Sequence, residues 1–99
     1  MILLIQQMNP SHRGKFIGTI GILTKYKPVQ FTAELKYLQH RLLLDLSDYP
    51  IKDYNQRVFV YGKLFVYKIK DKLLFKLKVY HIERTTISNF TVETIGSYT

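Results

Sequence analysis

The segment between Arg57 and Glu83 holds the densest set of residues that could contact a ligand. Apolar and lysine side chains alternate through it, and a period of two is typical of β-strands, whose successive side chains point to opposite faces. The face that we expect to point outward combines aromatic rings with lysines. Its members are Phe59, Tyr61, Lys63, Phe65, Tyr67, Lys72, Lys76, Lys78 and Tyr80. Rings stack with the bases of single-stranded nucleic acid while lysines bind its phosphates, so this face is a candidate nucleic-acid surface.

Two other interpretations of the same face stay open. A protein partner would cover the rings and leave the lysines at the rim of the interface. Alternatively, the apolar terminal segments, residues 1–7 and 90–95, would fold back and bury the rings within the chain itself. The pattern alone does not choose between a base-stacking surface, a partner surface and an internal packing surface.

The elements that carry this face are predicted to be strands. Five alternating runs follow one another: a long strand interrupted by Gly18 and Gly21, two medium strands, and two long strands that form a hairpin. They cover residues 15–26, 31–40, 41–46, 57–67 and 72–83. The polar segment at residues 47–56 has room for one helical turn at most. This order is that of an OB-fold, an all-β, five-stranded Greek-key barrel.

Two alternative folds remain. An SH3-like barrel is the main one, although its strands are usually shorter and it lacks a segment like residues 47–56. An open α+β sheet follows instead if residues 31–40 form a helix. We also expect a short lead-in strand at residues 1–7. The C-terminal tail has two interpretations: its β-branched residues favour a strand, whereas Ser88 is a candidate cap for a short C-terminal helix that carries Phe90 and Ile95. Residues 1–99 are predicted to form a single OB-fold domain.

Alternation also predicts which side chains form the core. On the three longest strands the predicted inward set is Phe16, Ile20, Ile22, Val58, Val60, Gly62, Leu64, Val66, Leu73, Phe75, Leu77 and Val79. On the two shorter strands a single apolar face is formed by Phe31, Ala33, Leu35, Tyr37, Leu42, Leu44 and Leu46. The hairpin part of this set is almost entirely aliphatic, as is typical of a barrel interior.

Basic residues also gather in two of the predicted loops. They are Lys68, Lys70 and Lys72, beside Asp71, in the loop of the hairpin, and Lys25, Tyr26 and Lys27 before the turn that follows the first long strand. In OB-folds these two loops flank the usual ligand groove. Their joint placement extends the candidate surface to both edges of that groove.

Composition narrows the class of protein further. The chain has 99 residues, a formal net charge of +8 and no cysteine. The absence of cysteine excludes disulfides and cysteine-based zinc sites, and the positive charge indicates a polyanionic partner. The apolar run at the N-terminus is too short for a signal peptide or a membrane span, so we expect no targeting segment.

No catalytic constellation is recognisable. His12, His40 and His81 lie far apart and lack the spacing of metal ligands, and the seven carboxylates form no convincing acid–base pair. No glycine-rich phosphate-binding loop is present either. We therefore expect no enzymatic activity, no catalytic residue, no metal, no cofactor, no small-molecule substrate and no membrane association.

Three stretches carry a resemblance to a known family. They are "LLIQQM" followed by "GKFIGTIGIL", the glycine-centred "RVFVYGKLFVYK", and "LLFKLKVYHIE". With them the chain resembles the smallest subunit of the telomeric CST complex, a single OB-fold related to the small subunit of replication protein A. The resemblance implies a larger OB-fold subunit as partner, single-stranded telomeric DNA as the ligand of the complex, a role in chromosome-end protection, and a nuclear, telomeric location.

Two rival functions follow from the residues alone. One is an autonomous single-stranded DNA or RNA binding protein, in the cytoplasm of a bacterial or phage-infected cell. The other is a purely structural module whose aromatic face contacts only protein. A steep loss of affinity with salt for the isolated chain would favour the first, because counterion release dominates such binding.

Overall fold

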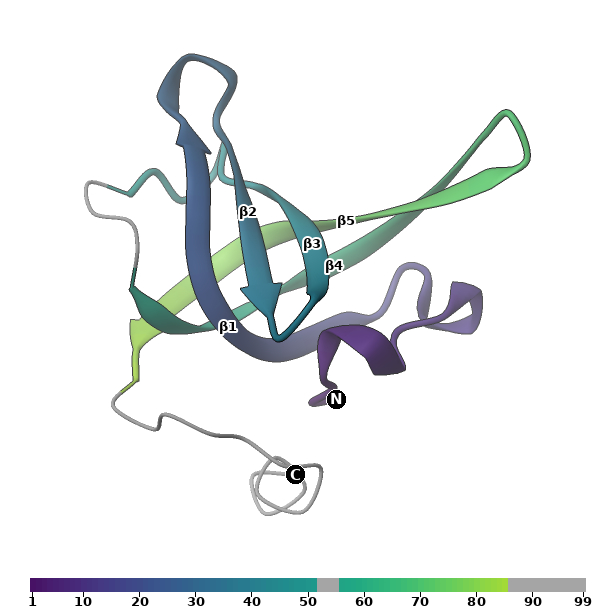
Figure 1. Ribbon diagram of the computed structural model, residues 1–99, viewed down its shortest axis with the longest axis horizontal. Helices are drawn as coiled ribbons and strands as arrows, with labels where there is room; N and C mark the ends of the chain where they lie inside the picture. The colour runs from purple at the N-terminus through teal and green to yellow at the C-terminus, as the bar shows by residue number, and fades with distance from the viewer. Residues whose placement is uncertain (52–55, 86–99) are drawn as a thin grey trace.

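The computed structural model describes residues 1–51 and 56–85, which form a closed five-stranded barrel (Figure 1). The strands are β1 (Phe16–Lys27), β2 (Thr32–Tyr37), β3 (His40–Asp45), β4 (Arg57–Ile69) and β5 (Lys72–Arg84), with short 3-10 turns η1 (Ile5–Gln7), η2 (Pro10–His12) and η3 (Pro28–Gln30). Their order around the barrel is β1-β2-β3-β5-β4. Neighbouring strands are antiparallel except β3 and β5, which are parallel.

This arrangement confirms the predicted OB-fold. Because residues 32–37 form a strand and not a helix, the open α+β sheet is excluded. No helix in the described ranges is long and apolar enough to cross a membrane. The expected C-terminal helix lies outside the described residues. Residues 47–51 and 56, which belong to the polar segment between β3 and β4, form turns and bends without a helical turn, and residues 52–55 lie outside the description.

The core of the barrel lies where alternation predicts it on β2, β3 and β4. The inward residues Val58, Val60 and Leu64 are almost completely buried, as are Leu77 and Val79 on β5. The shared apolar face of β2 and β3 is buried as well, through Ala33, Leu35, Leu42 and Leu44, with Leu46 just beyond β3. Phe31 is the exception on that face. It has a left-handed backbone (φ 53°) just before β2 begins, which turns its ring into solvent.

The predicted face of β1 is wrong. Phe16 and Ile22 were expected inside, but their side chains are 48% and 41% exposed, whereas Ile17 and Leu23 are buried in the barrel. The register explains this result, because residues directly opposite in an antiparallel pair share a face. Ile17 pairs with Gly62, whereas Phe16 pairs with the outward Lys63.

The N-terminal segment explains why the outer face of β1 also carries apolar residues. Ile2 forms a single parallel bridge with Gly18, and the Leu3 amide donates to the Gly18 carbonyl at 2.9 Å. The chain then enters η1, so the predicted lead-in strand is reduced to one bridge. Ile20 is buried outside the barrel in a second cluster, formed with Leu4 and flanked by Ile2, Tyr37 and Phe59.

The hairpin of β4 and β5 extends well beyond the barrel (Figure 1). The predicted four-residue loop is wrong, because the strands are joined by only two residues, Lys70 and Asp71, with φ of 47° and 66°. Positive φ at both positions is the requirement of a two-residue type I′ turn. Leu73 was predicted to point into the core, but it lies in the extended part and is 49% exposed.

Gly62 marks a β-bulge in the same hairpin. Tyr61 pairs with His81 and Gly62 with Val79, which leaves Tyr80 as the extra residue on β5. At this point the two backbones approach so closely that a Cβ on Gly62 would overlap the Lys78 carbonyl. Only glycine fits here, which explains the glycine at the centre of β4.

We expect Gly62→Ala to lower the free energy of unfolding by at least about 3 kcal/mol, because relieving the overlap would break the β4–β5 pairing at the bulge. Urea denaturation monitored by circular dichroism measures this loss. Gly14→Ala is the control: Gly14 has φ 78° but no atom within 4 Å of the position of a Cβ. It should therefore lose only about 1 kcal/mol, and equal losses in the two variants would contradict the packing explanation.

Candidate nucleic-acid and partner surfaces

One continuous outer surface contains half of the predicted site residues. We call it the ring-and-lysine stripe, and it consists of Phe16, Tyr61, Lys63, Phe65, Tyr67, Lys76, Lys78 and Tyr80. Cross-strand pairing places Lys63 opposite Lys78, and Phe65 opposite Lys76, on this face. Phe16 joins it from β1, opposite Lys63. Phe16 is absent from the predicted set because alternation places it on the inward face of β1, whereas its side chain points outward.

The rings of the stripe form two groups. In the first, Phe16 stacks on Tyr61 with ring centroids 5.9 Å apart and planes at 16°, and the Tyr80 ring lies 5.9 Å from Phe16. In the second, Phe65 and Tyr67 are stacked at 6.4 Å and 13°. Four of the five rings are between 38% and 48% exposed, and Phe65 is half-buried. Flat aromatic surface is therefore available to a ligand in both groups.

Phe59 belongs to the predicted set but not to the available surface. Its ring crosses Gly18, where a Cβ would lie only 2.5 Å from the ring edge, and it packs against the cluster of Leu4 and Ile20. The N-terminal segment thus buries this end of the outer face, as one of the three interpretations proposed. That burial ends before Tyr61, which remains exposed.

The lysines of the stripe lie among the rings. The Lys63 ammonium is 5.9 Å from the centre of the Phe65 ring, and that of Lys78 is 6.0 Å from the centre of Tyr80. Lys78 forms an ion pair with Asp48 at 3.2 Å. The hydrogen bond to Asp48 and its charge raise the pKa of Lys78. Within the described part of the chain, Lys63 and Lys76 form no ion pair.

Asp45 stands at the edge of the stripe, opposite Lys78 on the β3–β5 pair. Burial by itself would raise the pKa of its carboxyl group. The hydrogen bonds from Ser47, whose amide lies 2.9 Å from the carboxylate, and the charges of Lys76 and Lys78 outweigh burial. The pKa of Asp45 is therefore lowered, which shows that the ionised carboxylate is favoured where β3 meets β5.

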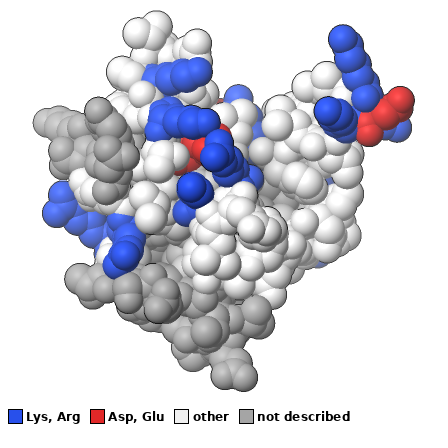
Figure 2. All heavy atoms as spheres, viewed as in Figure 1, with Lys and Arg blue, Asp and Glu red and all other residues white. Residues whose placement is uncertain are grey.

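The predicted loop residues lie apart from the stripe or at its end. Lys68, Lys70 and Lys72 are exposed at the hairpin tip, next to Asp71. Lys25 instead lies toward β2, where Glu34 binds both Lys25 (3.8 Å) and Arg41 (3.4 Å). On the face shown in Figure 2, basic side chains surround a carboxylate in the region of β2 and β3, and further lysines stand at the hairpin tip.

We call the basic group over β2 and β3 the front cluster; it comprises Lys25, Lys27, Lys36 and Arg41. Tyr26 is half-buried at the end of β1. Apart from Phe59, Tyr26 and the three lysines at the hairpin tip, the structure divides the predicted site residues between two surfaces. The stripe lies on β1, β4 and β5, and the front cluster lies on β2, β3 and the end of β1.

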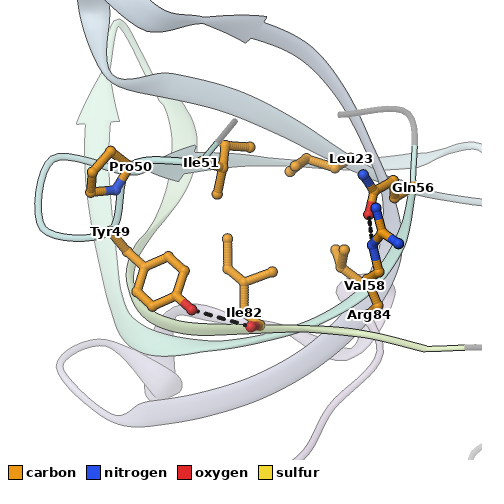
Figure 3. Close-up of a pocket in the computed structure, with 8 residues that line it drawn as sticks. All are labelled: Leu23, Tyr49, Pro50, Ile51, Gln56, Val58, Ile82 and Arg84. Atoms are coloured by element: carbon orange, nitrogen blue, oxygen red, sulfur yellow. Dashed lines mark hydrogen bonds between the residues drawn. The ribbon is translucent and has the colours of Figure 1, made fainter. Parts of the chain in front are cut away.

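Two pockets accompany these surfaces. The first, of about 220 Å³, lies at the end of the barrel next to the β3–β4 connection (Figure 3). Its walls are mainly aliphatic, the Tyr49 hydroxyl donates to the Ile82 carbonyl at 3.4 Å, and Arg84 Nε donates to Gln56 Oε1 at 2.6 Å. Its lining includes Ile51 and Gln56, and residues 52–55, which come between them in the sequence, lie outside the description.

The second pocket, of about 210 Å³, opens where β3 and β5 diverge. It is lined by Ile5, Gln6, Met8, His40, Arg41, Leu42 and Phe75. Neither pocket has the paired acid and base of a hydrolytic site. Among the described residues, no group of three His, Asp or Glu side chains is placed to hold a metal ion.

Comparison with known proteins identifies similar folds but no sequence family. No family model and no curated protein matches the chain. Among solved structures, the telomere-capping protein Ten1 from Saccharomyces pombe superposes with a TM-score of 0.63 and 16% identity, covering 89% of this chain and 83% of that one. A chain of the S. pombe Stn1–Ten1 complex gives a TM-score of 0.61 and 16% identity, covering 86% and 75%. The barrel of this protein is thus the fold of these structures.

We expect Asp45→Asn to lower stability at pH 7 by about 1 kcal/mol, because the folded state favours the charged carboxylate. Since the pKa of Asp45 is lowered from 3.8, this contribution is present above pH 3.8 and disappears as the pH falls through the folded-state value. Thermal melting between pH 7 and pH 2.5 should show the two proteins converging in acid. Asp71→Asn, at the exposed tip, is the control, and a deficit that grew on acidification would contradict the assignment.

Proposed function

We propose that this protein is the small OB-fold subunit of a telomere-capping complex that binds single-stranded DNA and includes a larger OB-fold chain. The observation that carries the proposal is the similarity of the β1-β2-β3-β5-β4 barrel, over most of both chains, to Ten1 alone and to a chain of the Stn1–Ten1 complex. The proposed role is binding and end protection in the nucleus, at telomeres, without enzymatic activity. The net charge of +8 supports contact with a polyanion.

Exposed apolar side chains on the hairpin support the presence of a protein partner. Ile69, Leu73 and Leu74 are large, apolar and substantially exposed in the part of the hairpin that extends beyond the barrel. The lining of the pocket at Phe75 includes the apolar side chains of Ile5, Met8 and Leu42. A projecting hairpin with apolar residues beside such a pocket fits a surface that a second chain covers, since exposed apolar groups of this kind mark interaction sites.

An autonomous single-strand binder is the second candidate. The rings and lysines of the stripe favour it, because such a surface binds a polyanion without help from another subunit. The two candidates differ in one respect that can be measured directly. A subunit is isolated from its cell in equal amount with a second chain, whereas an autonomous binder is isolated with nucleic acid alone.

Affinity purification of the tagged full chain from its native host, followed by mass spectrometry, tests the proposal. We expect one larger OB-fold protein in an equimolar amount, and chromatin immunoprecipitation should recover chromosome-end DNA. The control is Val60→Asp, because a carboxylate in place of this fully buried side chain should prevent folding and abolish capture. Nucleic acid without a stoichiometric protein, or a stoichiometric partner without an OB-fold, would overturn the proposal.

A further inference from the structure

We propose that the ring-and-lysine stripe is a stacking platform for single-stranded nucleic acid, so that the strand runs over β1, β4 and β5 and not over β2 and β3. Around the barrel, β4 is separated from β2 and β3 by β1 on one side and by β5 on the other. The stripe and the front cluster are therefore different surfaces. This inference deepens the proposed function by naming the part of the subunit that contacts the strand.

The arrangement of the rings suits bases. Phe16, Tyr61 and Tyr80 form one group and Phe65 with Tyr67 a second, with neighbouring centroids 5.9 to 6.4 Å apart. Each group presents a partly exposed aromatic surface on a rigid, hydrogen-bonded sheet. Because every base has an aromatic face, stacking of this kind tolerates any sequence.

The placement of the lysines argues for a polyanion over a protein partner. Lys63 and Lys78 lie directly opposite each other across β4 and β5, an arrangement of like charges that destabilises a sheet. Only one of them, Lys78, has a carboxylate within ion-pairing distance in the described structure. Protein interfaces are depleted of lysine at their centres, yet these lysines stand between the rings. Phosphates of a bound strand would neutralise both charges.

The chain's own N-terminus does not account for this surface. On the outer face, residues 1–4 contact Gly18, Ile20 and Phe59, and the rings of Phe16, Tyr61 and Tyr80 stay exposed. In the front cluster, by contrast, Glu34 already pairs with Lys25 and Arg41. Lys27 and Lys36 of the front cluster form no ion pair among the described residues either, so what sets the stripe apart is that its unpaired lysines lie among two groups of exposed rings.

Two double variants of the full chain test the platform. Tyr61→Leu with Tyr80→Leu removes two rings but keeps apolar bulk, and Lys63→Gln with Lys76→Gln removes two cations that form no ion pair with any residue in the described ranges. The matched control in the front cluster is Lys27→Gln with Lys36→Gln. All six residues are at least partly exposed on the outer surface, so circular dichroism and thermal melting should be almost unchanged.

Affinity for fluorescein-labelled oligothymidine is measured by fluorescence anisotropy at salt concentrations from about 50 to 200 mM. Over this range a protein that contacts phosphates loses affinity as salt rises. We expect the ring variant to bind about tenfold more weakly. The lysine variant should also lose affinity, and its log–log salt slope should fall by about 1.4 for two lost phosphate contacts. The front control should stay within about twofold of the wild type.

Two outcomes would overturn the platform. One is an affinity loss confined to the front control, which would place the strand over β2 and β3. The other is unchanged oligothymidine binding in both stripe variants together with loss of the co-purifying protein, which would make the stripe a protein interface. Failure of the proposed function is a separate result, because it is measured by the purification of the wild-type protein. If the wild type has no protein partner but the two stripe variants still lose affinity for oligothymidine, the proposed function fails and the platform does not.

Discussion

The short parallel pairing of β3 with β5 is the constraint on which the shape of this molecule depends. Only residues 43–45 and 76–78 take part, and this contact completes the barrel between its two antiparallel parts. Residues 72–75 of β5, which precede this contact, pair only with β4 and form the part of the hairpin that extends beyond the barrel. The pocket beside Phe75, the exposed Leu73 and the basic tip all follow from the divergence of β5 from β3. Asp45, held as a carboxylate by Ser47 and by Lys76 and Lys78, lies at the same junction.

A second local feature, the bulge at Gly62, connects the fold to the candidate site. The extra residue that the bulge inserts on β5 is Tyr80, and its ring lies beside Phe16 from β1. β-Bulges commonly redirect a side chain in this way. The close backbone approach that requires glycine in β4 therefore also assembles rings from three strands into one group. Stability and the proposed binding surface are linked here, since the same backbone geometry underlies both.

The sequence predicted the inward face of β4 correctly because the N-terminal segment covers the outer face of that strand only at Phe59, so alternation determines the burial of its side chains. It failed on β1, where Leu4 and the N-terminal bridge bury Ile20 outside the barrel and make both faces apolar. The prediction for Leu73 was wrong because alternation does not show at which residue a hairpin extends beyond its barrel. The two-residue turn was missed because Lys70 and Asp71 replace the usual Asn-Gly signal. Phe16 could have been found only from the register of β1 against β4.

The central claim is that a nucleic-acid strand contacts the stripe and not the front cluster. Heteronuclear NMR of the full chain, during titration with oligothymidine, tests it most directly, because amide shifts report the contacted surface even when binding is weak. If the strand contacts the stripe, the amide chemical shifts of Tyr61, Lys63 and Tyr80 should change most, and those of Lys36 and Arg41 should change little. Shifts concentrated at Lys36 and Arg41, or no shifts at saturating oligothymidine, would contradict it.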